Sequence, residues 1–512
     1  MKRPNILLII TDQLRADHTG FGGSSIVRTP NIDALASRGR VFNQAFVANP
    51  ICMPNRCSMI TGRVPSAHKV IFNDRSLAWS SNTFVRQLAA AGYETGLIGK
   101  SHIQHGTSRE SVVPIKQTPA IADPYQTGWN TIENYENYLE SGAPVTDFYG
   151  FKHAEFTLGH GDLVTGHHYQ WAIDKGAKPE DMLLNWPDSS WPAKARSEHW
   201  WQVYQPNLPE EYYSTTFVQE RSSDWISKQS NDKPWFLQCS FPDPHHPFTP
   251  PGKWWDAYQA ADMPIPHTIH DSLQNAPAHL RFFQSLVPRE NIVQMFGATE
   301  DIVKDAMAAE FGMIEFVDEG IGKIMSTLER QGMVDNTIVI FTSDHGDMFG
   351  DHGLMMKSMM HYEGCIRVPF IVAGPEIEPG ATDSLISSMD IAQTVLDITD
   401  DEPFDRMQGV SFKPVLEDST ATVRDHVYIE EDMPLVEALP KIPHRARTLV
   451  MPEHRVTLYS SHDLEVYDRV NDPDELNNLA VTDPGSPAVS GMKQRLMEAM
   501  LDYGDFSRLN ID

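Results

Sequence analysis

The stretch that decides the fold is residues 4–11, Pro-Asn-Ile-Leu-Leu-Ile-Ile-Thr, which is followed at once by Asp12 and Gln13. Its apolar residues do not alternate with polar ones, and such a run is typical of a parallel strand buried on both faces. A second run of this kind, residues 337–344, also ends in an aspartate, Asp344. Both aspartates are therefore expected at the carboxyl ends of central strands, where open α/β sheets place their ligand sites.

Strands and helices alternate along most of the chain. Further strands are expected at residues 94–99, 234–241 and 368–374, and helices at about residues 32–39, 84–92, 215–229 and 303–331. The longest of these helices has apolar residues at helical spacing, which is typical of a face packed on a core. The alternation predicts an α/β fold in which helices sandwich a large, mostly parallel sheet.

Residues 105–260 interrupt this alternation, with an insertion expected at about residues 105–230. They contain few periodic segments, and nine of the eleven tryptophans lie between Trp171 and Trp255. So long an insertion is expected to form either a second packed layer or a lid over a site. Packing is the expected role of most of these tryptophans, and the composition also indicates an apolar or aromatic pocket wall.

The tail follows a joint rich in proline and aspartate at residues 399–404. Two of its stretches suit a pair of antiparallel strands, and a final helix is expected near residues 490–502. We therefore predict a catalytic α/β domain at residues 1–398, which includes the tryptophan-rich insertion. Residues 399–512 are predicted to form a smaller α+β subdomain that carries an antiparallel sheet.

Charge and cysteine content exclude several classes of protein. With 69 acidic and 41 basic side chains, the net charge of −28 argues against binding to nucleic acid or an anionic membrane. An anionic substrate would then need local positive charge. Four cysteines in 512 residues cannot form a disulfide scaffold. The apolar run near the N-terminus is too short for a signal peptide or a membrane span, so a cytoplasmic protein is expected.

Two pairs of polar residues at strand ends predict a metal site. Asp12 is followed by Gln13, and Asp344 is followed by His345. Two carboxylates, an amide and an imidazole gathered at one sheet edge suit a single divalent cation with mainly oxygen ligands. Calcium, magnesium or manganese fits this set better than a metal that prefers thiolates.

A third motif begins at Cys52 and continues through Pro54, Asn55 and Arg56, then Cys57, to Thr-Gly-Arg at residues 61–63. Proline suits the first turn of a helix, so Cys52 is expected just before a helix N-terminus, where backbone N–H groups favour a developing anion. A thiol is nevertheless a poor ligand for a hard cation. Cys57 is expected to be a small buried residue of the same helix.

With this motif the sequence resembles the sulfatase family, within the alkaline phosphatase superfamily and near its bacterial arylsulfatase and phosphonate monoester hydrolase branch. The family signature is Cys-x-Pro-x-Arg followed by Thr-Gly-Arg, with serine commonly found where this chain has Asn55. Further similar segments are Gly-Lys-x-His at residues 99–102, Pro-His-x-Pro-Phe at 244–248 and the segment from Asp344 to Lys357. The resemblance implies an alkaline-phosphatase-like fold and a cysteine that a formylglycine-generating enzyme oxidises to formylglycine.

The resemblance also implies roles for individual residues. The residues that match the metal ligands of the family are Asp12, Asp344, His345 and the formylglycine made from Cys52. The residues that match groups binding the sulfate or its bridging oxygen are Lys100, His102, His245 and Lys357. Arg56 matches the residue that holds the formylglycine hydrate, and Asn73 falls where related enzymes contact the transferred group. Gln13 stands where many sulfatases have a second aspartate, so its part in metal binding stays open.

The implied reaction is hydrolysis of an organic sulfate monoester, an aryl- or alkylsulfatase activity. A diol oxygen of formylglycine attacks sulfur and displaces the alcohol or phenol, which either His245 or Lys357 protonates. His102 then takes the proton of the second hydroxyl, so that sulfate leaves and the aldehyde returns. Side activity on phosphorus esters is expected, because the same charges suit both centres.

Two other functions compete with this one. The first is a phosphonate monoester or phosphodiester hydrolase, a branch that shares the Asp-Gln and Asp-His pairs. Lys100 and His102 favour a sulfatase, because the phosphonate hydrolases resemble Tyr-x-Thr at these positions. The second is a non-catalytic binding protein, which the full set of polar residues argues against. A homo-oligomer, dimeric or larger, is expected to form through the C-terminal region.

Overall fold

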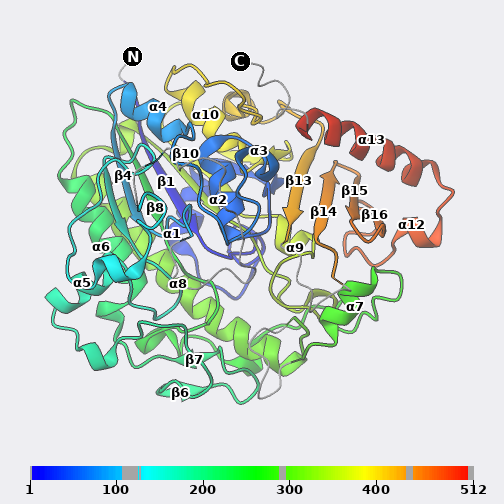
Figure 1. Cartoon of the computed structure of the whole chain (residues 1–512), viewed down its shortest axis with the longest axis horizontal. Helices are drawn as coiled ribbons and strands as arrows, with labels where there is room; N and C mark the ends of the chain where they lie inside the picture. Colours follow the sequence, from blue (N-terminus) through cyan, green and yellow to red (C-terminus); the bar gives the residue numbers. More distant parts are fainter. Residues whose placement is uncertain (1–2, 106–124, 126–127, 288–295, 434–441, 505–512) are drawn as a thin grey trace.

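The apolar runs assemble into a large sheet (Figure 1), seen in a computed structural model that describes residues 3–105, 125, 128–287, 296–433 and 442–504. From edge to edge its strands are β11 (Gly380–Thr382), β2 (Gly39–Phe42), β10 (Phe370–Ala373), β9 (Thr337–Ser343), β1 (Asn5–Thr11), β8 (Trp235–Ser240), β4 (Glu94–Gly99) and β5 (His153–Phe156). Neighbours along the run from β9 to β5 are parallel, whereas β10 pairs antiparallel with both β9 and β2. The predicted, mostly parallel sheet is confirmed.

The central strand β1 shows why its sequence does not alternate. Ile6, Leu8 and Ile10 enter the core on one face of the sheet. Leu7 and Ile9 enter the core on the opposite face, and all five side chains are buried. Because helices cover both faces, every position from Ile6 to Ile10 is apolar.

The longer helices divide between the two cores, and the shorter helices α7, α9 and α11 add residues to the core that contains Ile6. The helices on the face of Leu7 are α1 (Pro30–Ser37), α6 (Ser214–Ser227) and α8 (Glu300–Arg330). Those on the opposite face are α2 (Cys52–Thr61), α4 (Phe84–Ala90) and α10 (Asp390–Ile398). The shorter helices are α3 (Pro65–His68), α5 (His167–Asp174), α7 (Ala278–Gln284), α9 (Glu363–Ile366), α11 (Lys413–Glu417) and α12 (Leu479–Thr482). The strand pairs outside the large sheets are β3 (Ala45–Phe46) with β12 (Ile386–Ser387), and β6 (Ala195–Arg196) with β7 (Tyr204–Gln205).

The described part of the tryptophan-rich insertion packs as a layer. Strand β5 extends the large sheet, and helix α5 contributes to a small core that reaches Phe316 of α8. The tryptophans buried within the range 171–255 are Trp200, Trp225, Trp235 and Trp254. Packing is thus the role of these four, as predicted. Residues 106–124, 126 and 127 lie outside the described part of the chain.

A second sheet is built from the tail (Figure 1). Its antiparallel strands are β13 (Val427–Asp432), β14 (Arg445–Val450), β15 (His454–Tyr459) and β16 (Leu464–Asp468), and α13 (Pro487–Gly504) packs on one face. Its other face shares a core with the large sheet, since Val427 and Ile429 belong to the same cluster as Ile6. The domain boundary at residue 398 stays a prediction. Among the described helices, none is both long and apolar enough to cross a lipid bilayer.

Candidate active site

The predicted site residues gather at one edge of the large sheet. Asp12 follows β1, Lys100 follows β4 and Asp344 follows β9. His245 lies in the loop after β8, and the N-terminus of α2 brings Cys52 to the same place. Carboxyl ends of parallel strands leave a crevice that loops can line, so five separate segments of chain meet here.

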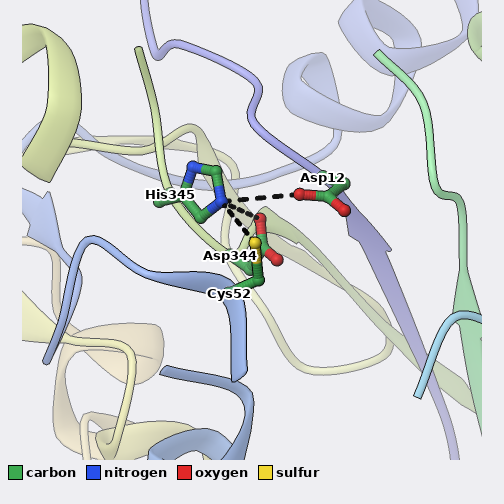
Figure 2. A group of neighbouring side chains, drawn as sticks. All are labelled: Asp12, Cys52, Asp344 and His345. Carbon is green, nitrogen blue, oxygen red and sulfur yellow. Dashed lines mark hydrogen bonds and ion pairs between the residues drawn. The ribbon is translucent and has the colours of Figure 1, made fainter. Parts of the chain in front are cut away.

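Asp12, Cys52, Asp344 and His345 form a compact group (Figure 2), and one ligand atom from each lies within 4.8 Å of the others. Nε2 of His345 is central to it. This atom is 3.1 Å from Sγ of Cys52, 3.5 Å from Oδ1 of Asp12 and 3.6 Å from Oδ1 of Asp344. All four side chains are buried.

The donor set of this group fits a divalent cation. Oδ1 of Asp12 is buried without a hydrogen-bond partner among the described residues. Nδ1 of His345 lies 2.9 Å from the carbonyl oxygen of Gly346, which it can donate to, so that Nε2 keeps a free lone pair. Burial alone would lower the pKa of His345, but the Asp344 carboxylate raises it above its ordinary value. The sulfur of Cys52 is the one poor ligand, and oxidation to an aldehyde hydrate would replace it with oxygen.

Helix α2 begins at Cys52 itself, with Pro54 in its first turn. The sequence placed Cys52 one position outside the helix, which is within the ordinary uncertainty of a helix end. The backbone N–H of Met53 donates to Oδ1 of Asn73 at 3.1 Å. Asn73 therefore lies at the start of α2, beside Cys52, and its contact with a transferred group stays a prediction.

Asn55 explains why this chain can depart from the serine of the family signature. It is fully buried, and its Nδ2 donates to the carbonyl oxygen of Asp344 at 2.5 Å. Its Oδ1 accepts from the backbone N–H of Ala48 at 3.0 Å and from Oγ of Ser388 at 2.6 Å. Asn55 thus ties α2 to the end of β9, and fixes Cys52 relative to Asp344.

The two cysteines of α2 lie in opposite electrostatic surroundings. Burial opposes ionisation of Cys52, yet Lys100 and Lys357 hold the pKa of its thiol well below the ordinary value. Burial raises the pKa of Cys57 well above that value, and Glu133 adds to this effect. Position 52 therefore favours negative charge and position 57 disfavours it.

Arg56 is held mainly by the sheet edge. Its Nε donates to Oδ2 of Asp344 at 2.7 Å, and Nη1 donates to Oγ of Ser240 at 2.8 Å and to the carbonyl oxygen of Lys100 at 3.0 Å. Nη2 has no hydrogen-bond partner among the described residues and lies 3.9 Å from Oδ2 of Asp12. One nitrogen of the guanidinium thus stays available for a ligand.

Lys100 links the candidate metal ligand Asp12 to a histidine that sequence reasoning missed. Its Nζ donates to Oδ2 of Asp12 and lies 2.6 Å from Nε2 of His160. The ring of His160 stacks on His245, with 3.7 Å between centroids. Asp12, His160 and His245 form a second group whose ligand atoms lie within 4.8 Å of one another, although the ammonium of Lys100 already provides a cation there.

Lys357 reaches the site from the segment between β9 and α9. Its Nζ donates to Oε1 of Gln13 at 2.7 Å and to Nε2 of His245 at 2.8 Å. Oε1 of Gln13 also lies 3.1 Å from Nδ1 of His246, and Nε2 of Gln13 donates to Asp347 at 2.9 Å. Gln13 thus connects Lys357 to the strand end that carries Asp12.

His102 lies in the loop after β4 with a left-handed backbone, φ 55°. Its Nδ1 is buried and has no partner in the described part of the chain. Burial, and after it the charges of Lys100 and Arg56, lowers the pKa of His102 well below the ordinary value. The imidazole is therefore neutral at neutral pH and able to accept a proton.

Sequence reasoning missed His160 because it lies in the range 105–230, for which no matching family segment was found. A histidine followed by glycine shortly after a strand was the available signal, since the loop after β5 ends at the same edge as the loop after β4. The site residues that the sequence did predict all lie at this edge of the large sheet or on the helix start and loops packed against it.

Comparisons with known proteins show the family and the fold of the chain. The family model described as "Sulfatase" matches residues 4–401, and one described as "N-sulphoglucosamine sulphohydrolase, C-terminal" matches residues 350–502. A solved structure of the phosphonate monoester hydrolase of Agrobacterium radiobacter is similar with a TM-score of 0.78 and 23% identity. That match covers 98% of this chain and 96% of the other, so the two folds are alike.

Two relatives are similar along nearly the whole chain. An arylsulfatase of Clostridium perfringens is 27% identical over 510 residues, which is 97% of this chain and 94% of the relative. A choline-sulfatase of Rhizobium meliloti is 28% identical over 491 residues, covering 93% and 82% respectively. Since the sulfatase model spans well over half of the sequence, the chain belongs to the sulfatase family.

Proposed function

We propose that the protein hydrolyses sulfate monoesters of alcohols or phenols at the edge of the large sheet. The observation that carries this proposal is that the charges of Lys100 and Lys357 both act on Cys52 at the start of α2, where Lys100 also contacts Asp12 and Lys357 contacts His245. The chain as a whole carries a charge of −28, so this local positive charge is what a small anionic ester would bind. Membership of the sulfatase family supports the same reaction.

A divalent cation and formylglycine are both part of the proposal. Asp12, Asp344, His345 and the oxidised Cys52 would hold Ca²⁺, Mg²⁺ or Mn²⁺, and the cation would supply charge stabilisation for the ester oxygens. Formylglycine would supply a nucleophilic hydroxyl and a second hydroxyl through which the acid group can be expelled. The site residues would orient the ester for this chemistry, protonate the leaving oxygen and take up the proton of the second hydroxyl.

The contacts of Lys357 make it the better candidate for protonating the leaving oxygen. His245 Nδ1 contacts the carbonyl oxygen of His246 and can donate to it, so its Nε2 accepts a hydrogen bond from the ammonium of Lys357. Lys357 then has protons to give, whereas His245 positions it. His102, neutral and with a free Nδ1, is proposed as the base of the second step.

The leaving group is proposed to lie against Trp186. This side chain is partly exposed, and its ring stands edge-on to His160 at 5.9 Å and to His246 at 6.3 Å. His160 stacks on His245, which is proposed to bind the ester, so the indole beside His160 offers a nearby apolar surface on which an aromatic ring can pack. Aryl sulfates are therefore the proposed substrate class.

The test is a panel of aryl, alkyl, choline and sugar sulfates assayed beside phenylphosphonates and phosphodiesters. We expect the highest kcat/KM for an aryl sulfate, with weaker turnover of phosphorus esters. Preference for a phosphonate monoester over every sulfate would instead support the alternative activity, which the pairs Asp12-Gln13 and Asp344-His345 favour. Absence of turnover with all esters, in protein that contains formylglycine and metal, would exclude both.

Maturation requires a formylglycine-generating enzyme in this proposal. Cys52, Pro54 and Arg56 are the residues such an enzyme would read, and all three are buried in the folded chain. Oxidation therefore has to take place before α2 packs onto the sheet. Mass spectrometry of protein made with and without the oxidising enzyme tests this, and finding that folded protein is oxidised efficiently would contradict it.

Assembly through the C-terminal region is the last part of the proposal. The large apolar side chains exposed among the described residues are Val410, Val470, Leu476, Val481, Met497 and Leu501. All lie in the C-terminal part, and Met497 and Leu501 are one helical turn apart on α13, where a second copy of the chain can cover them. Light scattering should show a dimer or larger oligomer that Leu501→Lys weakens. A monomer at all concentrations would refute it.

A further inference from the structure

The loop that carries Lys357 has an unusual backbone. Met356, Ser358 and Met359 all have left-handed φ angles, of 71°, 91° and 51° respectively. Residues other than glycine disfavour this region because the Cβ atom crowds the backbone, so such a loop persists only where its surroundings hold it. The contacts that hold this loop therefore decide where Lys357 lies.

A buried carboxylate from the C-terminal sheet provides these contacts. Glu431 in β13 is fully buried, and its Oε1 accepts a hydrogen bond from Oγ of Ser358 at 2.8 Å. Its Oε2 accepts a hydrogen bond from the backbone N–H of Met359 at 2.7 Å. The two residues that follow Lys357 are thus tied to one side chain, which lies 73 positions beyond Ser358 in the sequence.

The carboxylate is in turn anchored within the C-terminal sheet. Nε2 of His361 lies 3.0 Å from Oε2 of Glu431, and Nδ1 of the same ring lies 2.7 Å from Oγ1 of Thr448 in β14. Thr448 pairs with Thr457 in β15 at 2.7 Å. A buried network in which each of these groups has a partner can hold a precise geometry.

The head group of Lys357 shows what this geometry achieves. A lysine side chain is flexible, so its ammonium reaches a fixed point only when its backbone is fixed and its head group has partners. The partners are Gln13 at 2.7 Å and His245 at 2.8 Å. We propose that Glu431 is a positioning residue, which acts from the C-terminal sheet to fix the loop at 356–359 and so places the Lys357 ammonium against the ester.

This inference rests on the proposed function, since it gives Glu431 a role through a lysine that acts on the ester. The chain offers a matched control in Glu430, the preceding residue of β13. Glu430 is also buried, but its carboxylate accepts hydrogen bonds from the backbone N–H and Oγ of Ser66, at 2.8 and 3.0 Å. A general loss of stability should follow from substitution at either position. Displacement of the Lys357 ammonium should follow only from substitution of Glu431.

The experiment compares Glu431→Gln with Glu430→Gln in the full, oxidised, metal-loaded enzyme. The glutamine amide at position 431 replaces one acceptor with a donor facing Ser358 or Met359, so the loop should shift. We expect kcat/KM to fall about 10- to 100-fold for an ester with a poor leaving group, as small misplacements of acting groups do. Esters of good leaving groups, which need little protonation, should lose about threefold or less.

A double-mutant cycle separates positioning from other effects. In a Lys357→Ala background, Glu431→Gln should cause little further loss, because residues that act as a unit are not additive. Ser358→Ala removes one of the two hydrogen bonds that Glu431 accepts from this loop. Its loss of kcat/KM should depend on the leaving group in the same way but should be smaller. It also serves as the test if Glu431→Gln does not fold.

Three results would overturn the inference. The first is that Glu431→Gln and Ser358→Ala both leave the dependence on the leaving group unchanged, and the second is that Glu430→Gln reproduces the effect of Glu431→Gln. An equal loss from Glu431→Gln with and without Lys357 would also refute it. A wild-type enzyme without sulfatase activity would instead contradict the proposed function, so the two failures are distinguishable.

Discussion

The carboxyl edge of the large sheet and the C-terminal antiparallel sheet contribute to the site in different ways. At the first, polar side chains follow the strands directly, as Asp12 follows β1 and Asp344 follows β9. The second contains none of the residues that sequence predicts for the site. It nevertheless contacts the loop of Lys357 through Glu431, over hydrogen bonds of 2.7 and 2.8 Å.

The difference concerns what a residue must do in each place. Groups at the carboxyl edge meet the ester or the cation, so their chemical type is restricted and their spacing from the strand is short. A group in the C-terminal sheet has only to hold a loop, which any well-placed acceptor can do. We therefore expect substitutions at the edge to act on every substrate, and substitutions in the second sheet to act through Lys357 alone.

The largest effect is expected from Cys52→Ala, which removes the proposed nucleophile. Turnover of every ester should fall by about 10⁴-fold or more, as when the nucleophile of other hydrolases is removed. The fold should survive, because alanine suits a helix start in a buried position. Steady-state kinetics and thermal unfolding measure the two effects. Substantial activity in this variant would contradict the expectation that residues at the carboxyl edge are needed for every substrate.

Removal of the cation is expected to have the next largest effect. Dialysis against a chelator should abolish turnover, and one equivalent of Ca²⁺, Mg²⁺ or Mn²⁺ should restore it. Binding to the folded state alone stabilises by about 2.7 kcal/mol when the metal is at 100 times its Kd, so the midpoint of thermal unfolding should rise on addition.

The control for the metal effect is a carboxylate of the same edge outside the four-residue group. Asp243 follows β8, is fully buried and accepts a hydrogen bond from Thr215. Asp243→Asn should keep the thermal shift on metal addition, and Asp12→Asn should lose it. Elemental analysis that finds two zinc ions per chain would argue against the proposed site.

The features that could be predicted from sequence are those with a local signature. The buried strand β1, the amphipathic α8 and the motif from Cys52 to Arg56 each depend on residues a few positions apart. Strand position then brings Asp12, Lys100 and Asp344 together without further information, because parallel strands end at one edge. The four-residue group in the structure contains the residues that the sequence proposed for the metal.

The features that could not be predicted depend on contacts between distant segments. His160 lies in a region without a recognisable motif, yet it comes within 3.4 Å of Asp12. Asn55 replaces a serine of the signature, and only the structure shows that it binds the carbonyl oxygen of Asp344. Glu431 lacks any local pattern, since its partners Ser358 and Met359 belong to another part of the chain.

Trp186→Ala is expected to have a moderate effect that separates substrates. Loss of an aromatic contact is worth about 0.5–1.5 kcal/mol beyond burial, which corresponds to a roughly 2- to 12-fold rise in KM for aryl sulfates. Small alkyl sulfates should change less. Trp191, also in the insertion and partly exposed, serves as the control, since its ring makes no aromatic contact with a histidine in the described part of the chain. Equal losses for aryl and alkyl esters would exclude Trp186 as the leaving-group wall.

The smallest effect is expected from Cys57→Ala, which tests whether the chemistry of the carboxyl edge is confined to position 52 of helix α2. Cys57 is fully buried in the same helix as Cys52 and packs in the core beside Met53 and Ile60. From Cys57 the signature positions for proline and arginine are Met59 and Thr61, so the oxidising enzyme should ignore it. The variant should lose about 1 kcal/mol of stability by leaving a small void, with kcat/KM and formylglycine content unchanged.

Cys57→Ser should cost more, about 1–3 kcal/mol, if its buried hydroxyl lacks a partner. Denaturant unfolding and mass spectrometry of the peptide that contains both cysteines check these outcomes, and formylglycine at position 57 would show that the chemistry of the edge extends into the core.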